Sequence, residues 1–320
     1  MKKLALQDYV EGIKNKDRSI LARAITLVES ANEEHQKLAQ TLLTQILPLT
    51  GKSKRLGISG TPGVGKSTFI EAFGKMLTGQ NKSVAVLAVD PTSQVSGGSI
   101  LGDKTRMNEL AIDPKAFIRP SPSGETLGGV AKRTRESILL CEAFGFDFVI
   151  VETVGVGQSE TTVAQMVDMF IMLLQPGAGD DLQGIKRGIL ELVDMVVVTK
   201  DDGENSKIIQ RAKHDYAQAL QILRHDTHIP KVLSCSALTK AGLGEVLSGI
   251  NEYLSVHTSD ILKKREQQGL KWMWQLVHEG LEKKFKDSVP QKAIDEAESK
   301  VLGQTLSAPE AAIQLLKLMK

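Results

Sequence analysis

The segment "GTPGVGKS", from Gly60 to Ser67, has the spacing G-x-x-x-x-G-K-S that is typical of a phosphate-binding loop. It lies between the apolar run "RLGIS" and a helical pattern that begins at Lys66, which is the context that this motif requires. Glycines allow backbone N–H groups to converge on phosphate oxygens, while Lys66 is expected to reach the β- and γ-phosphates and Ser67 to ligate Mg²⁺. The expected nucleotide contacts are Gly60, Thr61, Pro62, Gly63, Val64, Gly65, Lys66, Ser67 and Thr68.

A second segment, "VVVTKDDGEN", suggests which base is bound. Lys200 and Asp202 follow an apolar run, as in the N/T-K-x-D element, and a carboxylate can accept hydrogen bonds from N1–H and N2–H₂ of guanine but finds no such pair on adenine. Thr199 stands where most GTPases have Asn, a departure that could loosen base selectivity. The later segment "SCSAL" supplies Ser236, Ala237 and Leu238 for the guanine O6 side. We therefore favour GTP over ATP, the alternative being a solvated charge cluster at a strand end.

Two carboxylates follow apolar runs and are candidates for the metal side. Asp90 ends "VLAVD" and Glu152 ends "FVIVE", with Gly155 completing a variant of the D-x-x-G element. Residues at the carboxyl ends of parallel strands face the ligand crevice, and Mg²⁺ prefers oxygen ligands. The alternative for either carboxylate is that it caps the next helix.

A glycine-rich loop, "QPGAGDDLQGIKRG" (175–188), follows the apolar run "MFIMLL". It is too rich in glycine for a core element, and its charge changes from Asp180 and Asp181 to Lys186 and Arg187. Opposed charges allow alternative pairings, as in segments that report the nucleotide state. The alternative is an exposed strand-to-helix loop with Asp181 as an N-cap.

The elements that must position these residues alternate along the chain. Short, uniformly apolar runs between helical patterns predict an α/β fold of the P-loop NTPase type, with a mostly parallel sheet covered by helices on both faces. The runs are "RLGIS", "SVAVLAVD", "FDFVIVE", "MFIMLL", "MVVVT" and "KVLSCS". We expect an N-terminal helical extension at 1–50, a GTPase domain at 51–256 and a C-terminal helical dimerisation arm at 257–320.

Composition narrows the function classes. Of 320 residues, 41% are hydrophobic and 24% charged, with a net charge of only +2, which argues against a nucleic-acid partner. No run approaches the roughly 18 apolar residues of a membrane span, so no membrane partner is expected. The two cysteines indicate buried thiols in a reducing compartment, and we expect a cytoplasmic protein.

Four segments together resemble the MeaB/ArgK family of P-loop GTPases, which is associated with methylmalonyl-CoA mutase. They are "GTPGVGKST", "VAVLAVDPTSQVSGGSILGDKTRM", "ETVGVGQSE" and "GDDLQGIKRGI". The resemblance implies a homodimeric chaperone that gates cofactor delivery to an adenosylcobalamin-dependent acyl-CoA mutase and protects or reactivates it. It also implies that Asp90, Asp103 and Glu152 serve Mg²⁺ and hydrolysis, and that the loop with Lys186 is a third mobile segment. Cobalamin itself is not expected to be held by this chain, because no histidine lies in a D-x-H-x-x-G element.

The catalytic apparatus looks incomplete. Ras-type GTPases have a water-orienting Gln directly after the D-x-x-G glycine, whereas Val156 follows Gly155 here and Gln158 comes two residues later. We therefore expect slow intrinsic GTP hydrolysis that a partner stimulates, with Lys186 needed for the stimulated rate. The rival function is an ATPase or kinase linked to periplasmic arginine, lysine and ornithine transport, against which the guanine-binding element argues. A metal-inserting GTPase would need a Cys/His-rich motif, which the sequence lacks.

Overall fold

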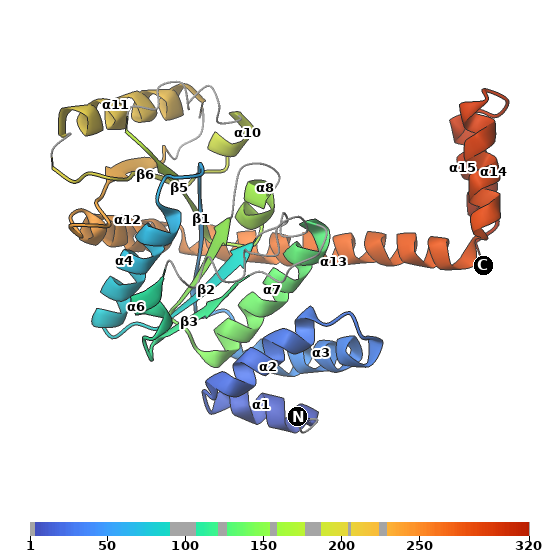
Figure 1. Ribbon diagram of the computed structural model, residues 1–320, viewed down its shortest axis with the longest axis horizontal. Helices are drawn as coiled ribbons and strands as arrows, with labels where there is room; N and C mark the ends of the chain where they lie inside the picture. Colours follow the sequence, from blue (N-terminus) through green and yellow to red (C-terminus); the bar gives the residue numbers. More distant parts are fainter. Residues whose placement is uncertain are drawn as a thin grey trace. The chain divides into compact units, whose positions relative to one another are not determined.

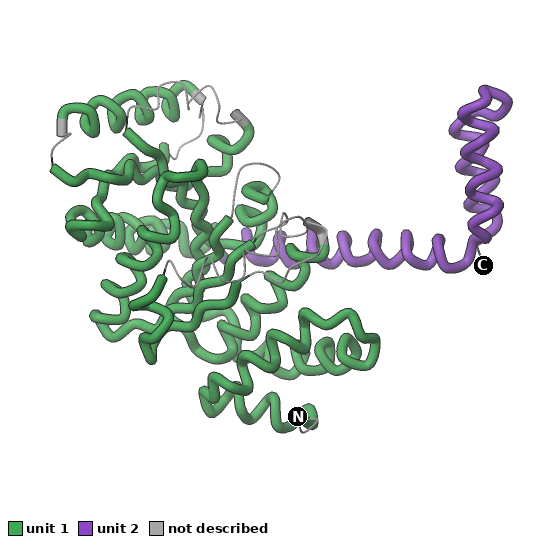
Figure 2. Tube along the Cα trace, in the orientation of Figure 1, with its two compact units in different colours: residues 1–261 green, residues 262–320 purple. Residues whose placement is uncertain are grey.

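The computed structural model describes residues 4–89, 107–120, 127–153, 159–176, 187–203, 206–223 and 229–319. The chain divides into two compact units, residues 1–261 and 262–320 (Figure 2). The first unit therefore contains the N-terminal helices as well as the nucleotide-binding region.

A seven-stranded parallel sheet forms the centre of the first unit, in the order β3-β2-β4-β1-β5-β6-β7 (Figure 1). The strands are β1 Lys54–Gly60, β2 Val84–Val89, β3 Ala116–Arg119, β4 Phe148–Thr153, β5 Met169–Leu174, β6 Met195–Val198 and β7 Lys231–Ser234. The predicted α/β fold with a parallel sheet is confirmed. The strand β1 lies between β4 and β5, so the segment that follows it emerges at the middle of the carboxyl edge.

Helices cover both faces of this sheet, which explains why β2, β4, β5 and β6 are buried along their whole length. In β4, Phe148 and Ile150 join one buried cluster, while Val149 and Val151 join the other. The first cluster also contains side chains of α4 (Lys66–Gly79), α6 (Asn108–Ala111) and α12 (Leu243–Val256). The second contains side chains of α1 (Leu6–Lys14), α2 (Arg18–Glu29), α3 (Glu33–Ile46), α7 (Leu127–Phe144), α8 (Ser159–Ala164), α10 (Arg187–Leu190) and α11 (Ser206–Leu223).

Three aspartates, Asp147, Asp168 and Asp194, each stand directly before a strand and tie it to a neighbour. Their carboxylates accept the backbone N–H groups of Ser83, Arg55 and Phe170 at 2.8, 2.7 and 2.8 Å. Charge-assisted hydrogen bonds of this kind are stronger than neutral ones. The three pairs fix the strand register at the amino edge, and thereby which residues reach the carboxyl edge together.

The N-terminal helices are joined to the edge strand β3. Asp17 caps α2 by accepting the N–H groups of Ser19 and Ile20. The guanidinium of Arg18 donates to the carbonyls of Asp113 and Pro114, at 3.4 and 3.1 Å, and to that of Ala116. Arg18, the first residue of α2, thus supplies side-chain donors to backbone carbonyls at and just before the edge strand β3.

The second unit contains most of α13 (Thr258–Ser288), together with α14 (Gln291–Leu302) and α15 (Ala308–Lys317). The side-chain oxygen of Ser307 accepts the N–H of Glu310 and caps α15. A stripe on α13 stays exposed at helical spacing: Leu270, Trp274, Val277 and Leu281 are 59%, 57%, 40% and 52% exposed. Four large apolar side chains are thus exposed along one stripe of α13.

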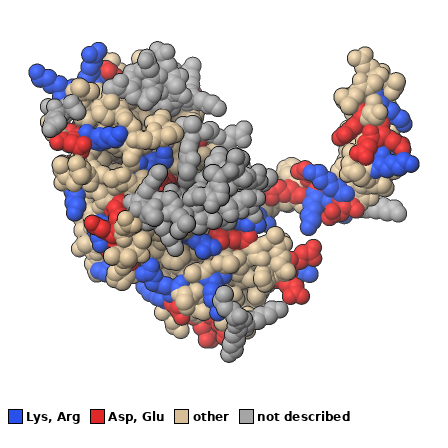
Figure 3. Space-filling model, viewed as in Figure 1, with Lys and Arg blue, Asp and Glu red and all other residues tan. Residues whose placement is uncertain are grey.

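Charged side chains of both signs are interspersed over the described surface of the first unit (Figure 3). This distribution agrees with the small net charge. Among the helices that the structure describes, none combines the length and the apolar character needed to cross a membrane.

Candidate nucleotide-binding site

The phosphate-binding loop leaves the carboxyl end of β1 and enters α4, as its motif requires. Glycine is needed at Gly60, because a Cβ there would lie 2.5 Å from the carbonyl oxygen of Leu173. Gly63 and Gly65 have φ values of 80° and 94°, a region that favours glycine. The side chain of Val64 is fully buried and anchors the loop in the core. The conformation of the loop is therefore restrained by its packing against the sheet.

Lys66 folds back over this loop. Its Nζ donates to the carbonyl oxygens of Gly60 and Thr61 at 2.7 and 3.3 Å. Burial lowers the pKa of the Lys66 ammonium, and the nearby carboxylates of Glu152 and Glu160 oppose that shift. The ammonium therefore lies at the loop mouth, where it can transfer from backbone carbonyls to phosphate oxygens.

Ser67 and Glu152 form the part of the metal side that the structure describes. The Ser67 hydroxyl donates to Oε1 of Glu152 at 3.3 Å, and Glu152 is only 3% exposed near the end of β4. A hydroxyl and a carboxylate at this separation are the oxygen donors that Mg²⁺ prefers, so these residues fit the ion. Elsewhere in the described ranges, no three His, Cys, Asp or Glu side chains form a group that could hold a metal.

The first half of the base-binding element contacts the phosphate loop directly. The Thr199 hydroxyl is within hydrogen-bond distance of the Val64 carbonyl, at 2.8 Å, and of the Leu174 carbonyl, at 3.3 Å. Lys200 has a φ of 62° and donates from Nζ to the Gly63 carbonyl at 3.1 Å. The Thr199 side chain is 5% exposed and is occupied with the loop backbone, so its structural role differs from base selection.

Asp202 and Ser236 come together from two loops that are 34 positions apart in sequence. The Ser236 hydroxyl donates to Oδ1 of Asp202 at 2.5 Å and accepts the N–H of Thr239 at 2.9 Å. Ala237 is half-buried, whereas Leu238 is 79% exposed. The carboxylate that would accept the guanine N–H groups is thus oriented by the loop that would contact O6.

The loop of Ser236 is held by a tight turn at Gly242. A Cβ on Gly242 would lie 2.3 Å from the carbonyl oxygen of Ser234, and its φ is 76°. The N–H of Asp201 donates to the Cys235 carbonyl at 3.2 Å. These backbone contacts fix the spacing of the two loops, so the base side is built without a ligand.

Several predicted site residues lie outside the described residues. Asp90, Asp103 and Lys186 are among them, as are the segments 154–158 and 177–186. Their assignments remain predictions.

Other residues contact this region without a signal in the local sequence. Glu160 is 1% exposed at the start of α8 and acts electrostatically on Lys66. Gln175 lies beside Gly63, and its carbonyl accepts the hydroxyl of Tyr216 at 3.3 Å. Glu160 and Gln175 lie in segments that the sequence indicates as functional, but Glu and Gln are common anywhere in a chain, so the sequence did not predict these particular contacts.

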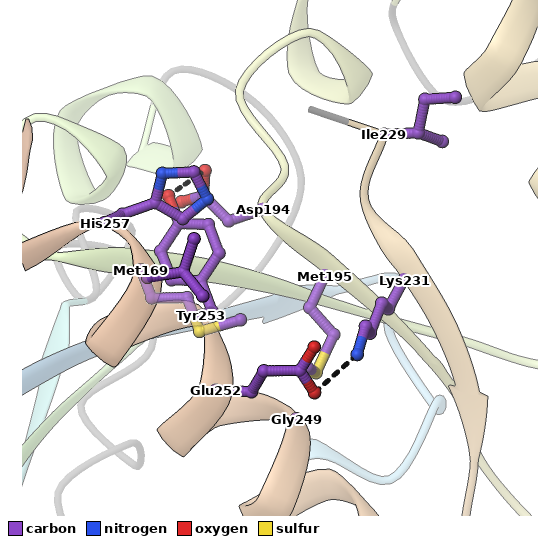
Figure 4. Close-up of a pocket in the computed structure, with 10 residues that line it drawn as sticks. Met169, Asp194, Met195, Ile229, Lys231, Gly249, Glu252, Tyr253 and His257 are labelled. Carbon is purple, nitrogen blue, oxygen red and sulfur yellow. Dashed lines mark hydrogen bonds and ion pairs between the residues drawn. The ribbon is translucent and has the colours of Figure 1, made fainter. Parts of the chain in front are cut away.

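A separate cavity of about 360 Å³ lies at the amino edge of the sheet (Figure 4). Met169 and Met195, which begin β5 and β6, line it together with side chains of α12. At its margin Tyr253 donates to Asp194 at 2.8 Å. Because the phosphate loop follows the carboxyl end of β1, this cavity is not the nucleotide site.

Comparison with known proteins gives consistent matches over nearly the whole chain. The family model described as methylmalonyl Co-A mutase-associated GTPase MeaB matches residues 21–289. The "GTPase ArgK" of Escherichia coli is 52% identical over 84% of this chain and 82% of its own length. The mitochondrial "methylmalonic aciduria type A homolog" of Mus musculus is 45% identical over 98% of this chain and 83% of its own. The crystal structure of a protein named "LAO/AO transport system kinase" is 40% identical, with a TM-score of 0.78 over 99% of this chain and 98% of that one.

Proposed function

The chain belongs to the family of methylmalonyl-CoA mutase-associated GTPases MeaB, and on that premise we propose that it is a GTP-hydrolysing chaperone of an adenosylcobalamin-dependent acyl-CoA mutase. Methylmalonyl-CoA mutase is the first candidate client. One observation supports a guanine nucleotide above all: Asp202 is oriented by Ser236 while the adjoining Thr199 and Lys200 hold the phosphate loop.

Hydrolysis in this proposal uses the residues around the phosphate loop. Lys66 binds the β- and γ-phosphates, and Ser67, Glu152, Asp90 and Asp103 hold Mg²⁺. The ion supplies charge neutralisation at the transferring phosphoryl group. The Ser67 hydroxyl and the buried Glu152 carboxylate are preorganised for this role, which supports it.

Partner control is the second part of the proposal. No Gln follows Gly155, so intrinsic hydrolysis is slow and the mutase accelerates it. The loop that contains Lys186 responds to the nucleotide and couples it to the client, gating cofactor loading and protecting or reactivating the mutase. The cobalamin stays with the mutase.

The decisive experiment is single-turnover GTP hydrolysis with and without saturating mutase. For Lys186→Ala we expect unchanged GTP affinity and basal turnover, but a stimulated rate at least roughly tenfold lower, because one charge that stabilises the stimulated state is lost. Full stimulation in the variant would mean that the segment 177–186 is a strand-to-helix loop without a switching role. Equal loss of both rates would instead make Lys186 an active-site residue.

The protein is a cytoplasmic homodimer in this proposal. The exposed stripe at Leu270, Trp274, Val277 and Leu281 supports an association through α13, because four large apolar side chains at helical spacing favour burial against another surface. Sedimentation of the full chain tests it. A monomer at micromolar concentration would contradict the assignment.

A second candidate function comes from the similar protein named "LAO/AO transport system kinase". For this chain it would mean an ATPase or kinase that serves amino-acid transport, and it requires adenine binding. Titration with GDP and ADP separates the two functions: comparable affinity for ADP would remove the GTPase assignment, while selective GDP binding would remove the kinase.

A further inference from the structure

Gln175 is the first residue after β5, and its position follows from the sheet register. In the pairing of β1 with β5, Gly60 lies opposite Leu173, so the chain after β5 emerges beside the phosphate loop. A Cβ on Gly63 would lie 3.8 Å from Nε2 of Gln175. The half-buried side chain of Gln175 therefore lies beside Gly63, on the side where a Cβ would point.

The backbone at this point is anchored from two further elements. The Tyr216 hydroxyl of α11 donates to the Gln175 carbonyl at 3.3 Å. The N–H of Thr199, just after β6, donates to the Leu174 carbonyl at 2.8 Å. Since Tyr216 is 4% exposed, this anchor lies inside the core, and the position of the carboxamide is set by the fold.

Gly63 thus has two neighbouring side chains, those of Lys200 and Gln175. Its carbonyl accepts the Lys200 ammonium at 3.1 Å, and its Cα faces the Gln175 carboxamide. Its φ of 80° lets the peptide turn, and a glycine has no side chain of its own to restrain that turn. In loops of this type, the backbone N–H groups must point at phosphate oxygens, so their orientation depends on external restraint.

We propose that Gln175 is a positioning residue for the bound nucleotide: anchored by Tyr216, its side chain braces Gly63 and keeps the backbone N–H groups of the phosphate loop directed at the phosphates. The brace connects α11 with the phosphate site. It rests on guanine-nucleotide binding and hydrolysis by this chain, and is independent of which mutase is the client.

The test compares Gln175→Ala with Gln175→Leu, using the full chain loaded with a fluorescent GDP analogue. Removing the brace should raise the GDP dissociation rate by roughly three- to tenfold, because the loop backbone loses a side chain that limits its movement. The rate of GTP hydrolysis per bound nucleotide should also fall. Leucine retains the bulk of the side chain and should restore most of the slow dissociation. Gln218→Leu, at an exposed position of α11, is the matched control.

A second variant tests the anchor without touching the brace. Tyr216→Phe removes only the hydroxyl and should raise GDP dissociation in the same direction but by less, with Tyr9→Phe in α1 as its control. In the double variant Gln175→Ala, Tyr216→Phe, the two effects should be less than additive, because the anchor acts through the brace.

A GDP dissociation rate in Gln175→Ala within roughly twofold of the parental rate would overturn the proposal. A lower melting temperature with an unchanged GDP dissociation rate would also overturn it, because that result is expected if Gln175 serves only core packing. If Gln175→Ala does not fold, Tyr216→Phe decides, and unchanged dissociation there would overturn it. Failure of the proposed function looks different: the parent protein would then not bind GDP at all, or would not respond to the mutase.

Discussion

The Thr199 hydroxyl offers a direct measure of how strongly the base-binding element supports the phosphate loop. It is 5% exposed and lies 2.8 Å from the Val64 carbonyl and 3.3 Å from the Leu174 carbonyl. A hydroxyl has one hydrogen, so it donates to one carbonyl at a time, and the shorter distance favours Val64. Thr199→Val keeps the branched shape of the side chain and removes this donor.

The size of the expected loss in affinity follows from the hydrogen bonds that each carbonyl keeps in Thr199→Val. The Leu174 carbonyl also accepts the N–H of Thr199 at 2.8 Å, so it stays hydrogen-bonded in the variant. The Val64 carbonyl loses the hydroxyl donor in a buried setting. Losing this hydrogen bond, and with it a donor to the buried Val64 carbonyl, costs about 1–3 kcal/mol of free energy. Because the carbonyl belongs to the phosphate loop, we expect at least about 1 kcal/mol to appear as weaker nucleotide binding, which is roughly fivefold or more in affinity.

The assay is equilibrium and stopped-flow binding of fluorescent GDP and GTP analogues, with the melting temperature measured in parallel. Thr199→Val should weaken GDP, GTP and xanthosine nucleotides by the same factor, since the hydroxyl contacts the loop backbone. Thr199→Ser should retain near-parental affinity, and Thr41→Val, exposed on α3, should leave it unchanged. Parental affinity in Thr199→Val, or a loss confined to guanine nucleotides, would refute the reasoning.

Three further variants test other parts of the site and the core. Asp202→Asn should abolish the preference for GTP over xanthosine triphosphate in a competition assay, because the carboxylate that accepts the guanine N–H groups is lost. Lys66→Ala should remove nucleotide binding or hydrolysis while the melting temperature stays near the parental value; hydrolysis at the parental rate would exclude the site. Burial raises the pKa of Glu136 to about 7 from its usual 4.5, which nearby Lys132 and Arg133 only partly offset. The unfolded chain thus releases this proton at lower pH than the folded chain, so the free energy of unfolding should fall as the pH rises from about 4.5 to 7. Glu136→Gln should have a free energy of unfolding up to about 3 kcal/mol above that of the parent when the pH is above 7, but not near pH 4.

Six of the seven strands could be predicted because each contains an apolar run, and β1, β2, β4, β5 and β6 are largely buried. The exception is β3, Ala116–Arg119, which was not predicted from the sequence. It has four residues, two of them only half-buried, between Pro114 and Pro120. An edge strand pairs on one side only, and here the backbone carbonyls near its start are served by the guanidinium of Arg18. Its apolar run, Ala116 to Ile118, has only three residues and is flanked by two charged residues and two prolines, so it does not stand out from a loop.

Some parts of the nucleotide site could be predicted from the sequence and others could not. The proposed contacts with the nucleotide involve residues close together in sequence, such as Lys66 and Ser67 after the loop glycines, so a short motif predicts them. Contacts that hold the loop in place join distant segments: Thr199 reaches Val64 across 135 positions, and Lys200 reaches Gly63 across 137. Their partners are backbone carbonyls, which every residue has, so no residue type marks them.

These long-range contacts bear on how such a protein could respond to a partner. The carbonyls of Gly63 and Val64 are held by Lys200 and Thr199, which adjoin the base-binding Asp202. A displacement of the residues after β6 would disturb the buried hydrogen bond between Thr199 and the Val64 carbonyl, and would thereby alter the phosphate loop. Base and phosphate sites are therefore mechanically linked through one strand end. A client that displaces this strand end would change nucleotide affinity without contacting the nucleotide, and by linkage the nucleotide would change affinity for the client by the same factor.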